Sequence, residues 1–215
     1  MMKVLVSDKM DEAGIDIFRN QDGIDVDVNT GLSPEALREI IGSYDALAIR
    51  SATRVDKALL DAAANLKVVA RAGVGLDNVD IDEATRKGVA VMNTPGGNTV
   101  TTAEHAIAMM MSLTRNIPQA TASLKAGKWE KNRLLGREVF NKTLGVIGFG
   151  NVGSGVAHLA KGLRMRVMVH DPNISREHIE KQGFEFVELD DLYSQADYIT
   201  VHVPKMEATI DLLDA

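Results

Sequence analysis

The chain has 215 residues, of which 45% are hydrophobic and 25% are charged, a balance typical of a globular protein with one large domain or two small ones. Its formal net charge of −6 argues against nucleic-acid binding as the default function, because phosphate binding requires clustered basic residues. The sequence has no cysteine, which excludes disulfides, thiolate nucleophiles and cysteine-ligated metals. The apolar run at the N-terminus is too short for a signal peptide or a membrane span, so we expect a cytoplasmic protein.

Short apolar runs rich in β-branched residues alternate with segments of helical period in the first half of the chain. This alternation is typical of βαβ units and of a buried parallel sheet. The expected strands cover residues 3–7, 24–28, 46–50, 67–71 and 89–92. One of the helices between them should begin at Ser33-Pro34-Glu35, where Ser is the N-cap, Pro takes the first helical position and an acid follows.

A turn-rich segment at residues 93–98 separates these elements from one long apolar helix, expected over residues 100–115, that is a candidate bridge between domains. The following segment 126–133 is polar and basic around Trp129 and is typical of a surface arm. Because the long helix is apolar over more than one face, we expect the full-length protein to form a homo-oligomer, with the arm covering a neighbouring subunit.

A second βαβ series follows the arm. Its expected strands cover residues 143–148, 166–170 and 198–203, with a short strand near Phe184; its expected helices cover residues 151–162, a segment after Ser175, and 189–195. A complete six-stranded dinucleotide-binding fold needs more strands than these. We therefore expect an α/β protein with domains at 1–98 and 99–215, the second being a C-terminally incomplete, doubly wound parallel Rossmann domain.

A turn of pattern G-x-G-x-x-G links the strand at 143–148 to the helix at 151–162: Gly148-Phe149-Gly150-Asn151-Val152-Gly153. Its first glycine permits a tight turn, its second lets the backbone approach a pyrophosphate, and its third lets helix and strand pack closely. The amides at the helix start, around Asn151 and Val152, should face the phosphates. The turn therefore predicts a dinucleotide site.

The strand at 166–170 ends at Asp171, about 20 residues after the turn, where a carboxylate accepts hydrogen bonds from the adenosine ribose hydroxyls. A carboxylate there repels a 2′-phosphate and favours NAD over NADP, although Arg176 nearby weakens this preference. The alternative is a glycine-rich turn and a helix-capping Asp with no ligand.

These motifs, together with residues 50–53, 69–80, 84–88, 93–96, 115–120, 127–129 and 171–172, make the chain resemble the D-2-hydroxyacid dehydrogenases, most of all their D-3-phosphoglycerate dehydrogenase branch. The resemblance covers essentially the whole chain. It implies a flavodoxin-like substrate-binding domain before the NAD-binding domain. It also implies NAD-dependent oxidation of 3-phospho-D-glycerate to 3-phosphohydroxypyruvate in serine biosynthesis.

The resemblance also implies roles for individual residues. Arg50 and Ser51 match a site that holds the anionic groups of the substrate, and Gly73 and Val74 match a loop whose amides face the substrate carboxylate. Val74 and Val203 match positions that contact the cofactor. The alternatives are a solvated arginine, a plain tight turn at Gly73 and Val74, and a core valine.

The acid/base His, its orienting Glu and the Arg that polarises the substrate carbonyl all belong, in the family, to segments after residue 215. None can be carried over, so the resemblance implies no catalytic residue here, and we expect the isolated chain to lack dehydrogenase activity. His105 and His158 are better interpreted as histidines on helix faces. Lys131 and Arg133 suit a solvated charge run better than a neighbouring subunit's substrate site.

We expect a small anionic 2-hydroxy acid as the ligand, and no metal, nucleic acid or membrane partner. Two other functions remain open: a dehydrogenase of the same family acting on glycerate, lactate or a longer acid, and a non-catalytic NAD-sensing regulator on the same scaffold.

Overall fold

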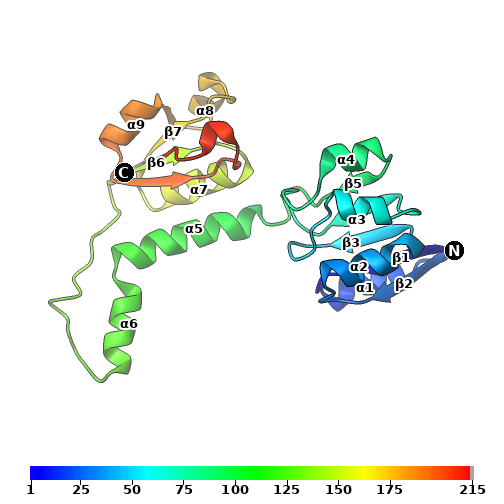
Figure 1. Cartoon of the computed structure of the whole chain (residues 1–215). Coiled ribbons are helices and arrows are strands. Elements are labelled where there is room, and N and C mark those ends of the chain that lie inside the picture. The colour runs from blue at the N-terminus through cyan, green and yellow to red at the C-terminus, as the bar shows by residue number, and fades with distance from the viewer. Residues whose placement is uncertain (214–215) are drawn as a thin grey trace. The chain divides into compact units, whose positions relative to one another are not determined.

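A computed structural model describes residues 1–213 of the chain (Figure 1). The chain divides into two compact units, one of residues Met1–Asn98 and one that begins at Thr99. Each unit holds one sheet, and every strand pair in these two sheets is parallel. Within residues 1–213, no helix has both the length and the apolar character needed to cross a membrane.

The first unit has a five-stranded sheet of order β2-β1-β3-β4-β5. Its strands are β1 (Met2–Val6), β2 (Ile24–Val28), β3 (Ala46–Ile49), β4 (Val68–Arg71) and β5 (Ala90–Met92), and its helices are α1 (Glu12–Arg19), α2 (Pro34–Ile40), α3 (Lys57–Ala62) and α4 (Ile81–Arg86), with a 3-10 turn at Ile41–Ser43. All four residues of β3 are buried, so the centre of the sheet forms the core. The strand order reverses between β1 and β3, and in such sheets the crevice beyond the carboxyl ends of the two strands is the usual ligand site.

The second unit has a four-stranded sheet of order β8-β7-β6-β9. Its strands are β6 (Thr143–Ile147), β7 (Arg166–His170), β8 (Glu185–Phe186) and β9 (Tyr198–Val201), and its helices are α5 (Thr99–Thr114), α6 (Ile117–Lys125), α7 (Asn151–Gly162), α8 (Arg176–Lys181) and α9 (Leu189–Gln195), with a 3-10 turn at Glu207–Thr209. Helix α5 packs against α7, where a Cβ on Gly155 would lie 3.2 Å from the Cβ of Ala103. Helix α6 and the loop after it extend away from this sheet (Figure 1).

Local sequence signals explain where several helices begin. The Ser33 hydroxyl accepts a hydrogen bond from the amide of Ala36, and Pro34 occupies the first turn of α2, which confirms the predicted start signal. Asp11, Asp56 and Asp80 cap α1, α3 and α4 in the same way. The starts of α1, α2, α3 and α4 are therefore fixed by side chains close to them in sequence.

Several predicted boundaries are wrong by one or two residues, and one helix is missing from the prediction. Arg50, Gly148 and Val203 lie just after their strands, because β3, β6 and β9 end at residues 49, 147 and 201. Helix α6 has no counterpart among the predicted elements. It is separated from α5 by Asn116, whose φ of 53° places it in the left-handed region and ends the preceding helix.

Candidate functional site

The glycine turn of the second unit lies between β6 and α7, and two of its glycines are required by the protein itself. Gly148 has φ of 90°, and a Cβ there would lie 2.6 Å from the carbonyl oxygen of His202. A Cβ on Gly153 would overlap the carbonyl oxygen of Gly148. The first glycine therefore permits the turn beside the end of β9, and the third permits the close packing of α7 on that turn.

Gly150 is different, because apart from its immediate neighbours in the chain no atom of residues 1–213 lies within 4 Å of where its Cβ would be. It is the N-cap residue of α7, with φ of −71°, and it provides no side-chain hydrogen bond to the helix. The first amides of α7 therefore keep N–H groups for an acceptor outside the helix. An open space in front of free amides is the geometry that binds an anion such as a phosphate.

Asp171 and Val203 lie beside this turn. The Asp171 carboxylate accepts hydrogen bonds from the amides of Phe149 (2.7 Å) and Asn173 (2.8 Å), so it ties the turn to the end of β7. Each of its oxygens retains a lone pair for a further donor. A methyl group of Val203 lies 2.9 Å from the position of a Cβ on Gly148. The structure thus brings the glycine turn, Asp171 and Val203 together at the carboxyl ends of β7, β6 and β9.

Two side chains near the turn have other partners. The Arg176 guanidinium lies over the ring of Phe186, 4.5 Å from its centroid, and is 3.4 Å from the carboxylate of Glu180. His202 is half-buried, with its imidazole 2.8 Å from the Thr200 hydroxyl, and burial lowers the pKa of this imidazole. Because burial disfavours the imidazolium, His202 is a neutral group at the edge of the turn at pH 7.

In the first unit, Arg50, Gly73 and Val74 line one cavity of about 450 Å³. Ser51 is exposed and is not among the residues that line it. The Gly73 amide donates to the Arg71 carbonyl at 2.9 Å, whereas the Val74 amide has no acceptor within residues 1–213. The cavity therefore presents one guanidinium and one free amide, the kind of donors that hold a carboxylate. The remaining lining residues are Met10, Asp11, Ala72, Thr94, Gly97 and Asn98.

The loop that carries Arg50 is held by Asp8, a residue that the sequence analysis did not single out. Asp8 is only 5% exposed, and its carboxylate accepts hydrogen bonds from the amides of Arg50, Ala52 and Thr53 and from the Thr53 hydroxyl. Burial acts to raise the pKa of Asp8, but these hydrogen bonds outweigh burial and hold the pKa below its usual value. What marks this residue is its place at the carboxyl end of β1, beside the point where the strand order reverses, and that order is known only from the fold.

Asn78 and Arg71 hold the same loop through its carbonyl groups. The Asn78 side-chain amide donates to the carbonyl oxygens of Arg50 (2.8 Å) and Thr53 (2.6 Å). The Arg71 guanidinium donates to the Arg50 carbonyl at 3.2 Å and pairs with Asp77 at 3.1 Å. Both residues lie in the segment that carries the family resemblance, but their contacts could be found only from the fold.

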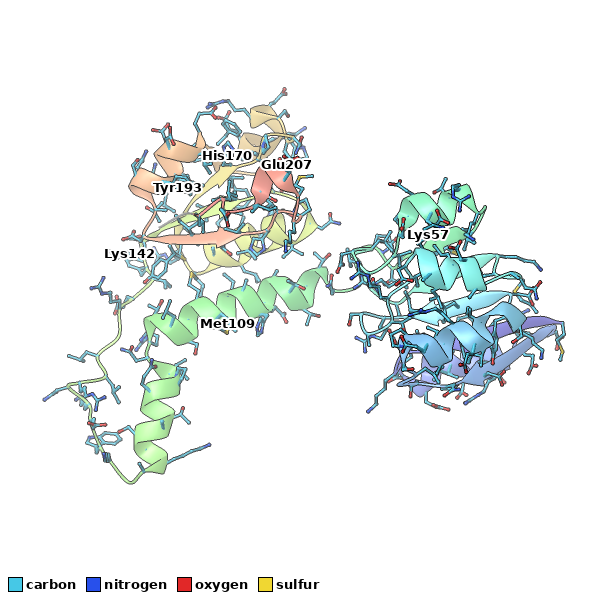
Figure 2. All side chains as sticks on the ribbon, viewed as in Figure 1. Lys57, Met109, Lys142, His170, Tyr193 and Glu207 are labelled. Carbon is cyan, nitrogen blue, oxygen red and sulfur yellow. The ribbon has the colours of Figure 1, made fainter. Side chains whose placement is uncertain are left out.

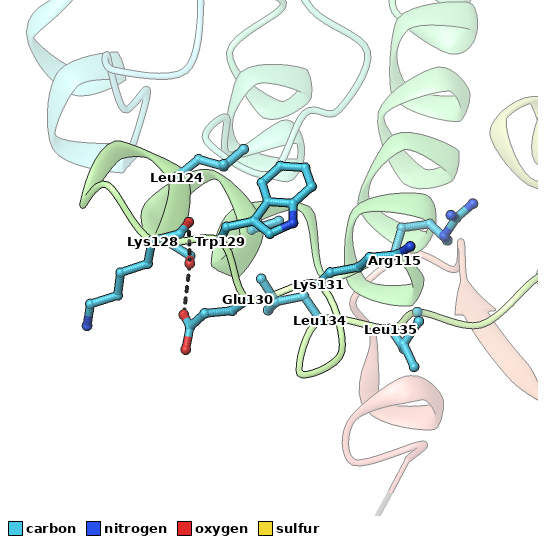
Figure 3. A pocket seen from close by; sticks show the side chains of 11 residues that line it. Arg115, Leu124, Lys128, Trp129, Glu130, Lys131, Leu134 and Leu135 are labelled. Atoms are coloured by element: carbon cyan, nitrogen blue, oxygen red, sulfur yellow. Dashed lines mark hydrogen bonds between the residues drawn. The ribbon is translucent and has the colours of Figure 1, made fainter.

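A second cavity, of about 330 Å³, lies between α6 and the arm around Trp129 (Figure 3). Trp129 is 80% exposed, and Lys131 is one of the lining residues. Arg133 pairs instead with Glu130, at 2.8 Å. On α5, Met109 (Figure 2) is 59% exposed and Leu113 is 73% exposed. The second unit therefore presents apolar side chains that the rest of its own described residues, 99–213, leave exposed.

Comparison with known proteins assigns the family. Residues 4–187 match the family described as D-isomer specific 2-hydroxyacid dehydrogenase, catalytic domain. The chain belongs to this family. The chain is 49% identical, over all 215 residues, to a D-3-phosphoglycerate dehydrogenase from Synechocystis, and it spans 38% of that protein. It is also 40% identical, over 99% of its own length, to a hydroxypyruvate reductase from Thermotoga maritima, and it spans 68% of that protein.

Two solved structures share the arrangement of strands and helices. The TT0316 protein from Thermus thermophilus superposes with a TM-score of 0.90 at 31% identity, and the match covers 99% of this chain and 68% of that one. A D-lactate dehydrogenase from Aquifex aeolicus, complexed with NAD and lactic acid, has a TM-score of 0.83 at 25% identity, with 96% and 62% of the two chains covered. The fold is thus that of the 2-hydroxyacid dehydrogenases.

Proposed function

We propose that this chain supplies the substrate-binding and cofactor-binding units of an NAD-dependent dehydrogenase that oxidises the C2 hydroxyl of 3-phospho-D-glycerate to give 3-phosphohydroxypyruvate. The observation that carries this proposal is the 49% identity, over all 215 residues, to the Synechocystis D-3-phosphoglycerate dehydrogenase. The chain spans 38% of that relative, so the activity is proposed for the whole protein.

In this proposal the first unit, residues 1–98, is a flavodoxin-like substrate domain, because 2-1-3-4-5 is the strand order of that fold. The second unit, from residue 99 on, is the NAD-binding domain. Its order β8-β7-β6-β9 corresponds to the first four positions, 3-2-1-4, of the doubly wound Rossmann order.

The residues of the second unit fit NAD. The open space at Gly150 and the free amides at the start of α7 suit a pyrophosphate, and Asp171 retains acceptors for ribose hydroxyls. The Asp171 charge also repels a 2′-phosphate, and Arg176 is already engaged by Phe186 and Glu180. When bound, NAD accepts the hydride from C2 of the hydroxy acid. The chain's own residues bind and orient the two ligands.

In the first unit, Arg50 would hold an anionic group of the acid, since a guanidinium binds carboxylate or phosphate through paired hydrogen bonds. The free amide of Val74, at the same cavity, would add a donor. Truncating Arg50 removes charge-assisted hydrogen bonds, which contribute about 1.5–3 kcal/mol each, so the affinity for the acid should fall by tenfold or more.

A second candidate is a reductase that converts unphosphorylated hydroxypyruvate to glycerate with a hydride from the reduced cofactor. It is supported by the 40% identity to the hydroxypyruvate reductase from Thermotoga maritima, of which this chain spans 68%. The two candidates differ in whether the site requires the phosphate group.

Calorimetric titration of the NADH-saturated chain with 3-phospho-D-glycerate, D-glycerate and D-lactate separates these candidates. We expect the phosphorylated acid to bind at least tenfold more tightly than D-glycerate, and Arg50→Ala to weaken its binding tenfold or more. Arg54→Ala is the matched control, because Arg54 lies in the same exposed loop but outside the cavity. Equal affinities for 3-phospho-D-glycerate and D-glycerate would favour the reductase. Binding of none of these acids would refute both candidates.

The whole protein should also be a homo-oligomer. The exposed Met109, Leu113 and Trp129 of the second unit form apolar surface of the kind that subunit interfaces cover. Sedimentation velocity should therefore show a dimer or tetramer of the full-length protein. A monomer at micromolar concentration would contradict this part of the proposal.

A further inference from the structure

We propose that Asp8 and Asn78 are positioning residues for the cavity that binds the hydroxy acid. Asp8 holds the N–H groups of the loop at residues 50–53, and Asn78 holds carbonyl groups of the same loop. Together they present Arg50 to the cavity. The inference rests on the proposed function of Arg50. It assigns a role in ligand binding to two residues that do not line the cavity themselves.

Asp8 provides the acceptors. One carboxylate oxygen accepts from the amides of Arg50 (2.6 Å), Thr53 (3.1 Å) and Ala52 (3.2 Å), and the other accepts from the Thr53 hydroxyl (2.6 Å). A carboxylate that is 5% exposed is costly unless it is fully hydrogen-bonded, and these four donors satisfy it. If Asp8 is truncated, three backbone amides in this loop lose their acceptor together.

Asn78 provides the donors. Its side-chain nitrogen donates to the carbonyls of Arg50 (2.8 Å) and Thr53 (2.6 Å), while its side-chain oxygen is buried and has no partner within residues 1–213. The side chain thus acts only as a donor toward this loop. Its own backbone is fixed, because the Asn78 carbonyl accepts from the Val55 amide at 2.8 Å.

The two clamps act on the same two residues. Arg50 and Thr53 each have their N–H held by Asp8 and their carbonyl held by Asn78. Arg50, Ser51 and Ala52 are exposed, so apolar packing cannot fix this loop. Side chains from two distant segments therefore fix the direction in which Arg50 leaves the backbone. Such preorganisation strengthens binding because the loop loses less entropy when the ligand binds.

A double-mutant cycle tests whether these residues act through Arg50. The Kd of the NADH-saturated chain for 3-phospho-D-glycerate is measured for the wild type and for the single variants Asp8→Ala, Asn78→Asp and Arg50→Ala. It is also measured for the two double variants that combine Asp8→Ala or Asn78→Asp with Arg50→Ala. Asn78→Asp is nearly isosteric and places carboxylate oxygens against the two carbonyls. Asp80→Ala is the matched control, because it also removes a carboxylate that accepts a backbone amide in this unit, that of Glu83 at 3.0 Å, at a helix start and not in residues 50–53.

We expect Asp8→Ala and Asn78→Asp each to raise the Kd about tenfold when Arg50 is present, and by less than about twofold when Arg50 is already alanine. Asp80→Ala should lower the melting temperature without changing the Kd. An unchanged Kd in the single variants, or equal effects with and without Arg50, would overturn the inference, because a purely structural role predicts additive losses.

Hydrogen exchange provides a readout that needs no ligand. The amides of Arg50, Ala52 and Thr53 should exchange faster in Asp8→Ala than in Asp80→Ala. Unchanged exchange would overturn the inference that Asp8 holds this loop. If the wild-type chain binds no acid but the exchange result holds, the proposed function of Arg50 fails and the positioning role fails with it. If the wild type binds acid and the cycle is additive, only the positioning role fails.

Discussion

Replacing Gly150 by alanine should weaken NAD binding while leaving the stability of the second unit nearly unchanged. Apart from its neighbours in the chain, the new Cβ meets no atom of residues 1–213 within 4 Å, and the φ of −71° at this position is allowed for alanine. Alanine is a poorer N-cap than glycine by roughly 0.5–1 kcal/mol, but it also stabilises the fold by about 0.4–1 kcal/mol through the lower entropy of the unfolded chain. These effects nearly cancel.

The loss of NAD affinity in Gly150→Ala is not offset in this way. The Cβ would stand in the open space in front of the free amides of α7, where the proposed pyrophosphate lies. We expect the Kd for NAD to rise tenfold or more, which corresponds to about 1.4 kcal/mol.

Gly153→Ala is the contrasting variant. Its Cβ would overlap the Gly148 carbonyl oxygen and lie 3.0 Å from the Gly148 carbonyl carbon, both of them backbone atoms that cannot move aside cheaply. Overpacking of this kind costs about 1–3 kcal/mol, which lowers Tm by roughly 2–4 °C per kcal/mol in a protein of this size.

Thermal unfolding and calorimetric titration with NAD, run on both variants and the wild type, distinguish these effects. Gly150→Ala should keep its Tm within about 2 °C of the wild type and lose affinity. If Gly150→Ala binds NAD as tightly as the wild type, the space at Gly150 is not the pyrophosphate site and the interpretation of this turn is refuted.

Three further predictions concern Asp171, Asp8 and the whole chain. Asp171→Ala should reduce the ratio of the NADP Kd to the NAD Kd about tenfold, because the repulsion of the 2′-phosphate is lost; an unchanged ratio would show that Asp171 does not select the cofactor. Because the folded-state pKa of Asp8 is lowered, its charge stabilises the fold above its unfolded pKa, about 3.9, and this stabilisation is lost as the pH falls through the folded pKa. The Tm difference between wild type and Asp8→Asn should therefore be larger at pH 7 than at pH 3, and an equal difference at both would contradict the assignment. The purified 215-residue chain should form no NADH from 3-phospho-D-glycerate, since the resemblance implies no catalytic residue within it; NADH absorbance rising above the protein-free rate would prove this wrong.

Much of the fold could be predicted from local pattern, because strand and helix signals are carried by neighbouring residues. The α/β alternation and the positions of β2, β7, α7 and α9 follow from apolar runs and helical period, and the start of α2 follows from Ser33 and Pro34. Helix α6 was missed because it is only nine residues long and polar residues interrupt its apolar positions, namely Gln119, Thr121, Ser123 and Lys125. Its start also depends on the left-handed Asn116, a conformation that pattern does not reveal.

Some residues of the candidate site could be predicted from the sequence, and others could not. The glycine turn and Asp171 could be proposed because a known motif gives each position a physical reason, and the structure brings them together. Asp8 and Asn78 could not, because residues 70 positions apart in sequence meet the same loop only after the sheet has formed. A hydrogen-bonded acid at a strand end has no sequence signature that distinguishes it from a solvated one.

The turn Gly148–Gly153 of this chain is proposed to bind NAD. An NMR titration of the ¹⁵N-labelled chain with NAD tests it most directly, since each amide reports on its own surroundings. We predict that the largest shifts fall on the amides of Gly150, Asn151 and Val152 and on that of Asp171. Saturation with NAD that leaves these amides unshifted, or shifts confined to other parts of the chain, would contradict the account.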